Sequence, residues 1–402
     1  MRLLAGILSV LLLGQSAAAG PVERGRYLAV LGDCAGCHTR QHGPDFAGGL
    51  PFHAQFGTVY STNITPDKQT GIGGWTTDQF YRALHEGIAA DGTHLYPAFP
   101  YVYFSRITRQ DSDDLFAFLK TVKPARQYPT PDKLIFPFNI RWGLIFWNWL
   151  YRPKAPPPIP ADRSAEWKRG EYLVNGLGHC AGCHTPKDLL FGDKTDRPLS
   201  GGLVDNWFAA NLTGRRQDGL GKWSHDDVVK FLATGRNKYA TAAGSMQEKV
   251  TLSTGHMTGE DRSAIATYLK SLPANGPTGT AMPDGKQMAA GEAVFVKNCK
   301  VCHAPPGQPD QPGSGPLPDY PKLGGDTLVM GQNPATVLRI ILAGAESPVT
   351  PNEHTTYSMP SFSTLSDKEI ADVATFIRNS WGNHAPPVSP PDVRATRARI
   401  SS

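Results

Sequence analysis

The sequence lacks the short motifs that mark many soluble enzymes. It contains no Walker A string, the pair His85-Glu86 has no second histidine to complete a zinc-protease motif, and the glycines at 71–74 do not have the spacing of a dinucleotide-binding loop. It also lacks any run of lysine or arginine, and its net charge of +5 is small for 402 residues. The chain therefore carries neither a recognisable catalytic constellation nor the basic footprint of a nucleic-acid-binding protein.

Long hydrophobic runs are scarce as well. One lies at the N-terminus, where Arg2 precedes an apolar stretch up to Leu13 and the small residues Ala17 to Ala19. A positive charge, a short apolar core and an A-x-A site are typical of a secretory signal peptide, here residues 1–19. An uncleaved signal-anchor is the alternative, although the run is shorter than the roughly 20 residues that span a bilayer. We therefore expect the mature protein to act outside the cytoplasm.

A second apolar stretch, residues 134–151, is rich in tryptophan but is interrupted by Pro137, Asn139, Arg141 and Asn148. It is also too short for a bilayer-spanning helix. Its aromatic rings suit a membrane interface or a partner surface, where amphipathic side chains are favoured. A core helix that covers the preceding part of the chain is the other interpretation, and both stay open.

No cysteine lies outside three pentapeptides of the form C-x-x-C-H, which begin at residues 34, 180 and 299. In an exported chain six cysteines would ordinarily predict disulfides, but this grouping is typical of covalent heme, in which the cysteines add to the vinyl groups and the histidine binds iron. A thiol–disulfide exchanger needs a strand–helix alternation that is missing here, and zinc needs four ligands from paired motifs. We therefore predict three covalent hemes c on Cys34, Cys37, Cys180, Cys183, Cys299 and Cys302, with His38, His184 and His303 as axial iron ligands.

Each heme motif lies in a repeated module. A short helical stretch with an early glycine (Gly25, Gly170, Gly291) precedes it, and amphipathic helices are predicted afterwards at 111–122, 259–272 and 366–381. The glycine would let the last helix approach the first closely. Candidate N-caps are Asp111, Thr258 and Ser366, and matching aromatic positions are Phe118, Tyr268 and Phe376.

These repeats predict an all-α protein of three tandem class I-like cytochrome c domains, each with a few short helices and long loops around one heme. The expected order is domain 1 (20–133), a Trp-rich segment and Pro-rich linker (134–160), domain 2 (161–273), a linker (274–286), domain 3 (287–384) and a disordered tail (385–402).

The first two modules also share an N-x-T motif followed by Trp75 or Trp223. The indole N–H of these tryptophans would suit a heme propionate, and an ordinary role in the hydrophobic core is the alternative.

Methionine is the common second iron ligand of a c-type heme, and its thioether raises the reduction potential. Met359 lies in the right region of the third module and Met246 in that of the second, with Met330 and Met257 as rivals that fit a core equally well. The first module has no methionine after Met1, and Phe99 stands at the corresponding position. Phenylalanine cannot bind iron, so the first heme is either bis-histidine, five-coordinate or otherwise ligated. His94 lies nearest the expected loop, and His42, His53 and His85 are the other histidines considered.

Several longer stretches then show a specific resemblance. They are GTVYSTNITPD (57–67), LYPAFPY (95–101), FPFNIRW (136–142), AIATYLKSLP (264–273) and RNSWGN (378–383). With these stretches, nearly the whole mature chain resembles the triheme cytochrome c subunits of membrane-associated bacterial dehydrogenases for alcohols, gluconate, sorbitol, fructose and aldehydes. In that family the first module usually has methionine where this chain has Phe99, and the departure is similar to members that serve molybdenum hydroxylases.

The resemblance implies a periplasmic complex at the outer face of the cytoplasmic membrane, with peripheral membrane contact. Its catalytic subunit, of flavin, quinone or molybdenum type, would pass electrons through three hemes to ubiquinone or a terminal oxidase. We expect stepwise transfer, no turnover by this chain alone, and a lower potential for a bis-histidine first heme than for methionine-ligated hemes. The alternatives are a peroxidase-like heme enzyme with an open iron at the first heme, and a thiol or zinc scaffold without heme.

Overall fold

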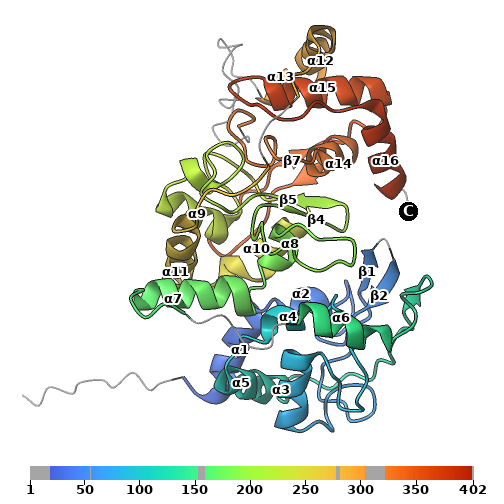
Figure 1. Cartoon of the computed structure of the whole chain (residues 1–402), viewed down its shortest axis with the longest axis vertical. Coiled ribbons are helices and arrows are strands. Elements are labelled where there is room, and N and C mark those ends of the chain that lie inside the picture. Colours follow the sequence, from blue (N-terminus) through green and yellow to red (C-terminus); the bar gives the residue numbers. More distant parts are fainter. Residues whose placement is uncertain (1–18, 55, 153–158, 278–280, 304–321, 401–402) are drawn as a thin grey trace, which may run out of the picture.

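The computed structural model describes residues 19–54, 56–152, 159–277, 281–303 and 322–400 (Figure 1). The predicted signal peptide, except Ala19, and most of the Pro-rich linker therefore lie outside the described residues. Figure 1 shows three groups of helices that follow one another along the long axis, each group containing one heme motif. The described chain is mostly helical, which confirms the predicted helical class.

The first module is built from nine short elements. They are α1 (Pro21–Leu31), α2 (Cys34–His38), β1 (Pro51–Ala54), β2 (Gly57–Tyr60), α3 (Thr77–Glu86), α4 (Tyr101–Phe104), α5 (Arg109–Leu119), β3 (Lys133–Leu134) and α6 (Gly143–Tyr151). The strands form one antiparallel sheet in the order β1-β2-β3.

The second and third modules repeat the pattern. The second holds α7 (Ala165–Tyr172), the π-helical η1 (Leu173–Leu177), α8 (Ala181–His184), β4 (Gly202–Val204), β5 (Trp207–Ala209), η2 (Leu220–Lys222), α9 (His225–Thr234), α10 (Ser245–Leu252), η3 (Thr254–His256) and α11 (Gly259–Lys270). The third holds α12 (Gly285–Asn298), α13 (Lys300–His303), α14 (Ala335–Ala343), β6 (Ala345–Glu346), β7 (Ser358–Met359), α15 (Asp367–Asn379) and α16 (Pro390–Ile400).

In every module the first helix crosses the closing helix at the predicted glycine. A Cβ on Gly25, Gly170 or Gly291 would lie only 1.9, 1.9 and 2.1 Å from the carbonyl oxygens of Asp114, Ala264 and Asp372. The next contact is with the Cβ of Phe118, Tyr268 or Phe376, the three aromatics that the sequence placed in matching positions. Only glycine permits backbones to approach this closely, so the crossing is the same in all three modules.

Most predicted helix starts are also confirmed. Thr258 and Ser366 cap α11 and α15, because their side chains accept the backbone N–H of Asp261 and Glu369. The expected cap at Asp111 is wrong: α5 begins earlier, at Arg109, and Thr108 is its N-cap. Asp111 instead lies in the first turn, where its charge is favourable and its backbone N–H is the one that Thr108 binds.

The first two modules form a pseudo-twofold pair. Tyr27 of α1 donates to Asp261 of the second module at 2.8 Å, and Tyr172 of α7 donates to Asp111 of the first at 2.5 Å. Each hydroxyl also accepts the N–H of the opposite N-cap threonine. Since one continuous hydrophobic core spans both modules, while the third has its own, the pair behaves as one packing unit.

Two sequence-based expectations need correction. The chain is not purely helical, because the three modules carry small antiparallel sheets of two or three strands. The tail is not disordered throughout: α16 packs against α14 and α15, with Val393 fully buried and Arg397 donating to the carbonyls of Ser363 and Leu365. The composition of this segment, rich in proline, serine and arginine, concealed the two valines, Val388 and Val393, that anchor it in the core of the third module.

The helix crossing predicts a clear mutational effect. Gly170→Ala should destabilise the heme-loaded protein by about 3 kcal/mol, because the methyl group would force α7 and α11 apart, as overpacking does elsewhere. The control is Gly259→Ala, which meets nothing within 4 Å in α11 of the same module and should be neutral or slightly stabilising. Urea unfolding followed by circular dichroism measures both, and equal midpoints for the two variants would show that the crossing does not need glycine.

Candidate heme sites

Each C-x-x-C-H motif forms a short helix immediately after the first helix of its module. These helices are α2, α8 and α13; α2 contains both cysteines of its motif, whereas Cys180 is the N-cap of α8 and Cys299 directly precedes α13. All six cysteines are free and partly exposed, so none is used in a disulfide. The described residues also contain no group of three or more His, Cys, Asp and Glu side chains placed to hold a metal ion.

The histidines of the first two motifs are oriented by backbone carbonyls. His38 Nδ1 lies 2.7 Å from the carbonyl oxygen of Thr62, and His184 Nδ1 lies 2.6 Å from that of Ala210. A carbonyl can only accept, so Nδ1 carries the proton and Nε2 keeps its lone pair. Burial lowers the pKa of both imidazoles, which keeps them neutral. This is the tautomer that a metal-binding histidine needs.

The N-x-T motifs explain why these carbonyls are in place. Asn63 Oδ1 accepts the N–H of Thr65, while its Nδ2 donates to the carbonyl of Ala125 beyond the closing helix, at 2.7 Å. Asn211 does the same in the second module: it accepts from Thr213 and donates to the carbonyl of Asn275, also at 2.7 Å. Thr62 and Ala210, directly before these asparagines, direct their carbonyls to the histidines. The two hydrogen bonds of each asparagine, which we call the asparagine clamp, therefore hold the imidazole indirectly.

A buried indole N–H provides a test of whether heme fits the second module. Trp223 is 5% exposed and stacks on Tyr239, yet its Nε1 makes no hydrogen bond. Buried polar atoms are usually paired, so an orphaned N–H indicates a missing acceptor. A heme propionate would supply one, whereas a thiol or zinc scaffold would not. Trp75, its counterpart, is only half-buried.

The four candidate methionines differ in how deeply their side chains are buried. Met330 is 2% exposed and Met257 is 5% exposed, and Met257 belongs to the core shared by the first two modules. Met246 in α10 and Met359 in β7 are partly exposed. The two rivals are therefore core residues, while Met246 and Met359 remain partly accessible, although Met359 also packs against the core of the third module.

The histidines of the first module differ in what they contact. His85 is held through both ring nitrogens, by the carbonyls of Tyr81 at 3.0 Å and Ile107 at 2.7 Å. His42 and His53 are exposed. His94 is half-buried, and its Nδ1 lies 3.4 Å from the amide nitrogen of Asn148. Phe99 packs edge-on against Phe104.

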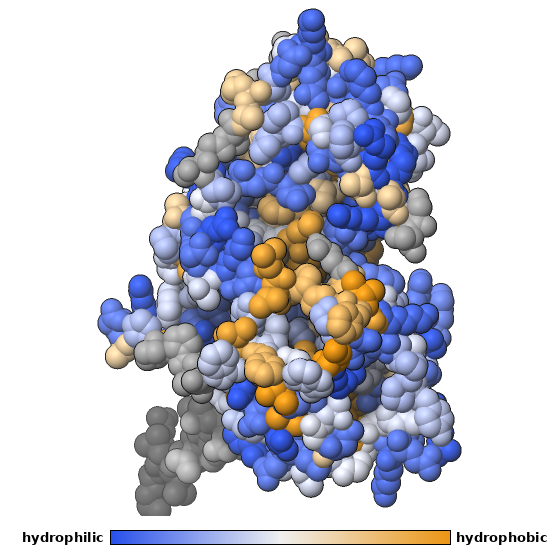
Figure 2. Space-filling view, turned by 45° about the vertical axis from the view of Figure 1, so that its right-hand side comes forward, coloured by the Kyte–Doolittle hydropathy of each residue, from blue (hydrophilic) through white to orange (hydrophobic). Residues whose placement is uncertain are grey.

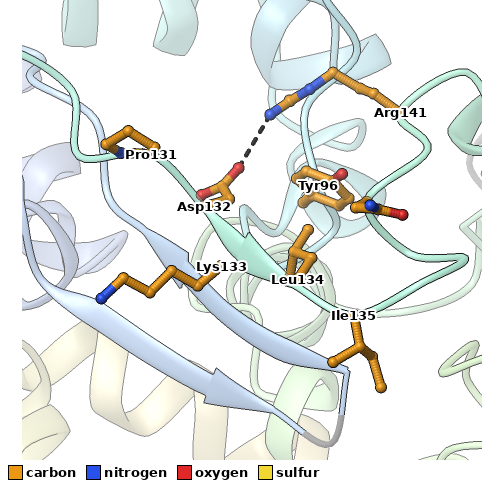
Figure 3. Close-up of a pocket in the computed structure, with 8 residues that line it drawn as sticks. Tyr96, Pro131, Asp132, Lys133, Leu134, Ile135 and Arg141 are labelled. Atoms are coloured by element: carbon orange, nitrogen blue, oxygen red, sulfur yellow. Dashed lines mark hydrogen bonds and ion pairs between the residues drawn. The ribbon is translucent and has the colours of Figure 1, made fainter.

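Two of the distinctive sequence stretches meet beside His94. Arg141 donates to the carbonyl of His94 at 2.8 Å, pairs with Asp132 at 3.0 Å and lies over the ring of Tyr96. Figure 3 shows this group at a pocket of about 640 Å³ whose lining includes Leu134 and Ile135. The segment between β3 and α6 thus holds the loop that carries His94 and Tyr96.

Some side chains of the Trp-rich segment are buried against the protein, and others are exposed to solvent. Leu144 of α6 is buried, and Asn148 accepts the hydroxyl of Tyr101 at 2.6 Å, so the interpretation as a covering helix is partly right. The Trp147 indole donates to the carbonyl of Leu190, which joins α6 to a turn of the second module. The remaining large side chains point outward and form what we name the apolar face: Ile135, Phe136, Phe138, Trp142, Ile145, Phe146, Trp149, Leu150, Leu189 and Leu190.

Figure 2 shows hydrophobic side chains gathered over the middle of the side that carries α6 in Figure 1. Phe136 and Trp149 are 76% and 71% exposed, far more than a core helix would leave. No helix among the described residues is long and apolar enough to cross a membrane.

Sequence reasoning missed one group at the junction of the first two modules. Asp33 and His179 stand immediately before the first cysteine of their motifs, and Lys249 of α10 reaches Asp33. The signal was present in the repeat, because aligning the two motifs places an aspartate opposite a histidine. Nothing in the sequence, however, indicated that α10 would pack against α2.

Comparisons with known proteins agree with this geometry. A family model described as cytochrome c matches residues 288–381. The chain is 39% identical over 406 residues to the cytochrome c subunit of alcohol dehydrogenase (quinone) from Gluconobacter oxydans, covering 95% of this chain and 84% of that protein. It is 39% identical over 394 residues to the gluconate 2-dehydrogenase cytochrome c subunit of Pantoea cypripedii, covering 90% and 86%.

A third relative is larger. A nicotinate dehydrogenase subunit of Pseudomonas putida is 39% identical over 384 residues, which are 92% of this chain but 31% of that protein. The matched subunits belong to different dehydrogenases. The chain belongs to the family of cytochrome c subunits of bacterial dehydrogenase complexes, in which it is an electron-transfer subunit and not by itself the enzyme.

Proposed function

We propose that the protein carries electrons through three covalent hemes c, from the catalytic subunit of a periplasmic dehydrogenase to ubiquinone or a terminal oxidase. The observation that carries this proposal is the fixed tautomer of His38 and His184, each directly after a cysteine pair, with Nε2 left for iron. The unpaired indole N–H of Trp223 supports it independently. Bound heme supplies reversible one-electron iron chemistry, and the protein holds its ligands and excludes water.

The attachment residues follow from the motifs. Cys34 and Cys37 would hold the first heme, Cys180 and Cys183 the second, Cys299 and Cys302 the third, with His38, His184 and His303 as proximal ligands. Met246 and Met359 are the distal ligands that burial favours for the second and third hemes, because Met257 and Met330 are packed inside cores. His94 is the proposed distal ligand of the first heme, since His85 is engaged at both nitrogens and the other two histidines are exposed.

The partner remains a flavin, quinone or molybdenum dehydrogenase subunit by class. Relatives named for alcohol, gluconate and nicotinate dehydrogenases support such a partner without choosing between the classes. Phe99 in place of a methionine is the feature of this chain that favours the molybdenum type.

The apolar face supports attachment at the outer surface of the cytoplasmic membrane. Exposed tryptophan, phenylalanine and leucine side chains are favoured at the boundary between lipid headgroups and acyl chains. Lys133 and Arg141 lie at its edge, where cations favour contact with anionic lipids. We therefore propose peripheral contact through α6 and the adjoining turn at 188–191.

Heme attachment is tested by mass. The mature chain, produced in a host that attaches heme, should have an intact mass larger than the polypeptide by three hemes, and all three should be reduced and reoxidised in an optical titration. A bare polypeptide mass would refute heme attachment. Rapid peroxide turnover together with a high-spin first heme would instead identify the peroxidase-like alternative.

A second prediction concerns the distal ligands. Met359→Ala should lower the potential of the third heme by more than about 59 mV, the shift equivalent to a tenfold change for one electron, because the thioether stabilises ferrous iron. Met330→Leu is the matched control: it keeps the volume of a buried side chain and should leave the potential unchanged. Spectropotentiometry decides, and the assignment is wrong if the leucine variant, and not the alanine variant, loses the methionine–iron band of the ferric spectrum.

A third prediction concerns the membrane. Replacing Phe146 and Trp149 together by serine should weaken binding of the heme-loaded mature chain to phosphatidylglycerol-containing vesicles at least about tenfold, since each buried aromatic contributes roughly 1.5–3 kcal/mol. Val296→Ser removes an exposed apolar side chain from α12, outside the apolar face, and should have no effect. Cosedimentation measures binding. Unchanged affinity of the double variant, or equal loss in the control, would point to a protein partner for this face.

A further inference from the structure

The heme motifs of the first two modules flank a closely packed junction. α10 of the second module packs against α2 of the first. His179 Nε2 lies 3.3 Å from the carbonyl oxygen of Gly32, and a Cβ on Gly32 would lie 3.4 Å from Cys34 Sγ and 3.3 Å from Leu177 Cδ1. The two cysteine pairs are therefore neighbours across the junction.

An ion pair is buried at this junction. Asp33 is 9% exposed, and its Oδ2 lies 3.7 Å from Lys249 Nζ, which makes no hydrogen bond. Buried ion pairs contribute little net stability, because desolvation offsets most of the attraction. An incompletely bonded pair between two heme motifs is thus poorly explained as a structural contact.

The two charges do not lie symmetrically. Asp33 precedes Cys34 of the first motif, whereas Lys249 lies one helical turn from Met246, the distal ligand proposed for the second heme. The position that matches Asp33 in the second module is His179, which carries no charge, because burial lowers its pKa to about 3. The repeat is thus broken at one position. Burial raises the pKa of Asp33, and the nearby Lys249 ammonium opposes that rise and so favours the charged carboxylate.

We propose that Asp33 and Lys249 form a fixed dipole that separates the reduction potentials of the first two hemes, lowering the first and raising the second. A negative charge stabilises ferric iron and a positive charge stabilises ferrous iron, and both effects are strong in a poorly solvated interior. The proposal rests on the proposed function, since it requires hemes at both motifs. It assigns to these two residues a positioning role in electron transfer that is independent of the distal ligands.

The decisive variant is Asp33→Asn combined with Lys249→Met. It removes both charges, keeps the net charge of the protein and nearly keeps the volume of both side chains. The midpoint of the first heme should rise and that of the second should fall, each by about 59 mV, equivalent to a tenfold change for one electron. Shifts of opposite sign are the signature, because general loosening or added water would move both midpoints in the same direction.

The matched control removes a similar pair elsewhere. Lys368 and Asp372 form an ion pair of 2.5 Å on α15 of the third module, and Lys368→Met with Asp372→Asn should leave the first two midpoints unchanged. Potentials are resolved by spectropotentiometry and intact mass confirms three hemes in every variant. Midpoints that stay constant or move together in the Asp33 and Lys249 double variant would overturn the proposal.

Failure of the proposed function is distinguishable, because it would appear as missing hemes in the unmodified chain. Should the double variant itself lose heme, Asp33→Asn alone carries the test, since asparagine keeps the shape of aspartate. That single variant should raise the first midpoint more than the second, and an equal or opposite response would refute the dipole.

Discussion

The whole arrangement depends on one contact, the crossing of the first and last helices of each module at a glycine. The carbonyl oxygen of the closing helix lies where a Cβ would be, so the two backbones are in direct contact. This crossing fixes where the first helix ends, and the heme motif begins within a few residues of that end. The loop between the two helices is held in the first two modules by the asparagine clamps, which turn a carbonyl toward the histidine. Helix packing thus determines where the C-x-x-C-H motifs lie, and the loops orient the histidines of the first two motifs.

The same architecture is used differently at the two ends of the chain. The first two modules exchange tyrosine–aspartate hydrogen bonds and share one core, which brings their heme motifs together. The third module keeps a separate core and joins the second through Thr336, whose hydroxyl bonds Phe208, and through the ion pair of Arg236 with Glu353. The modules are therefore ordered in space as in sequence, as a coupled pair followed by a more independent unit.

Some features were predictable from sequence because they depend on near neighbours, as the helix caps do, or because the chain repeats them in several modules. The crossing glycines, the caps at Thr258 and Ser366, and the repeated N-x-T motifs all follow from repeats within 402 residues. The features that could not be predicted arise from contacts between distant segments. Lys249 meets Asp33 only because α10 packs against α2, and α16 is ordered only because Val393 enters the core of the third module. Neither the composition of the tail nor the heme motifs themselves indicate these contacts.

The proposed dipole and the apolar face together limit where an electron donor and an electron acceptor can bind. With a low first heme and a higher second heme, spontaneous transfer runs from the first module to the second, so the catalytic subunit has to deliver electrons near the first. The apolar face lies on α6 and the turn at 188–191, hence on the first two modules. If the proposed membrane contact holds, an acceptor dissolved in the membrane would meet the first two modules before the third, whereas an oxidase in the aqueous phase would reach the third module at the far end of the molecule (Figure 1). Whether the acceptor is ubiquinone or an oxidase therefore depends on whether electrons pass through the third module before they leave the protein.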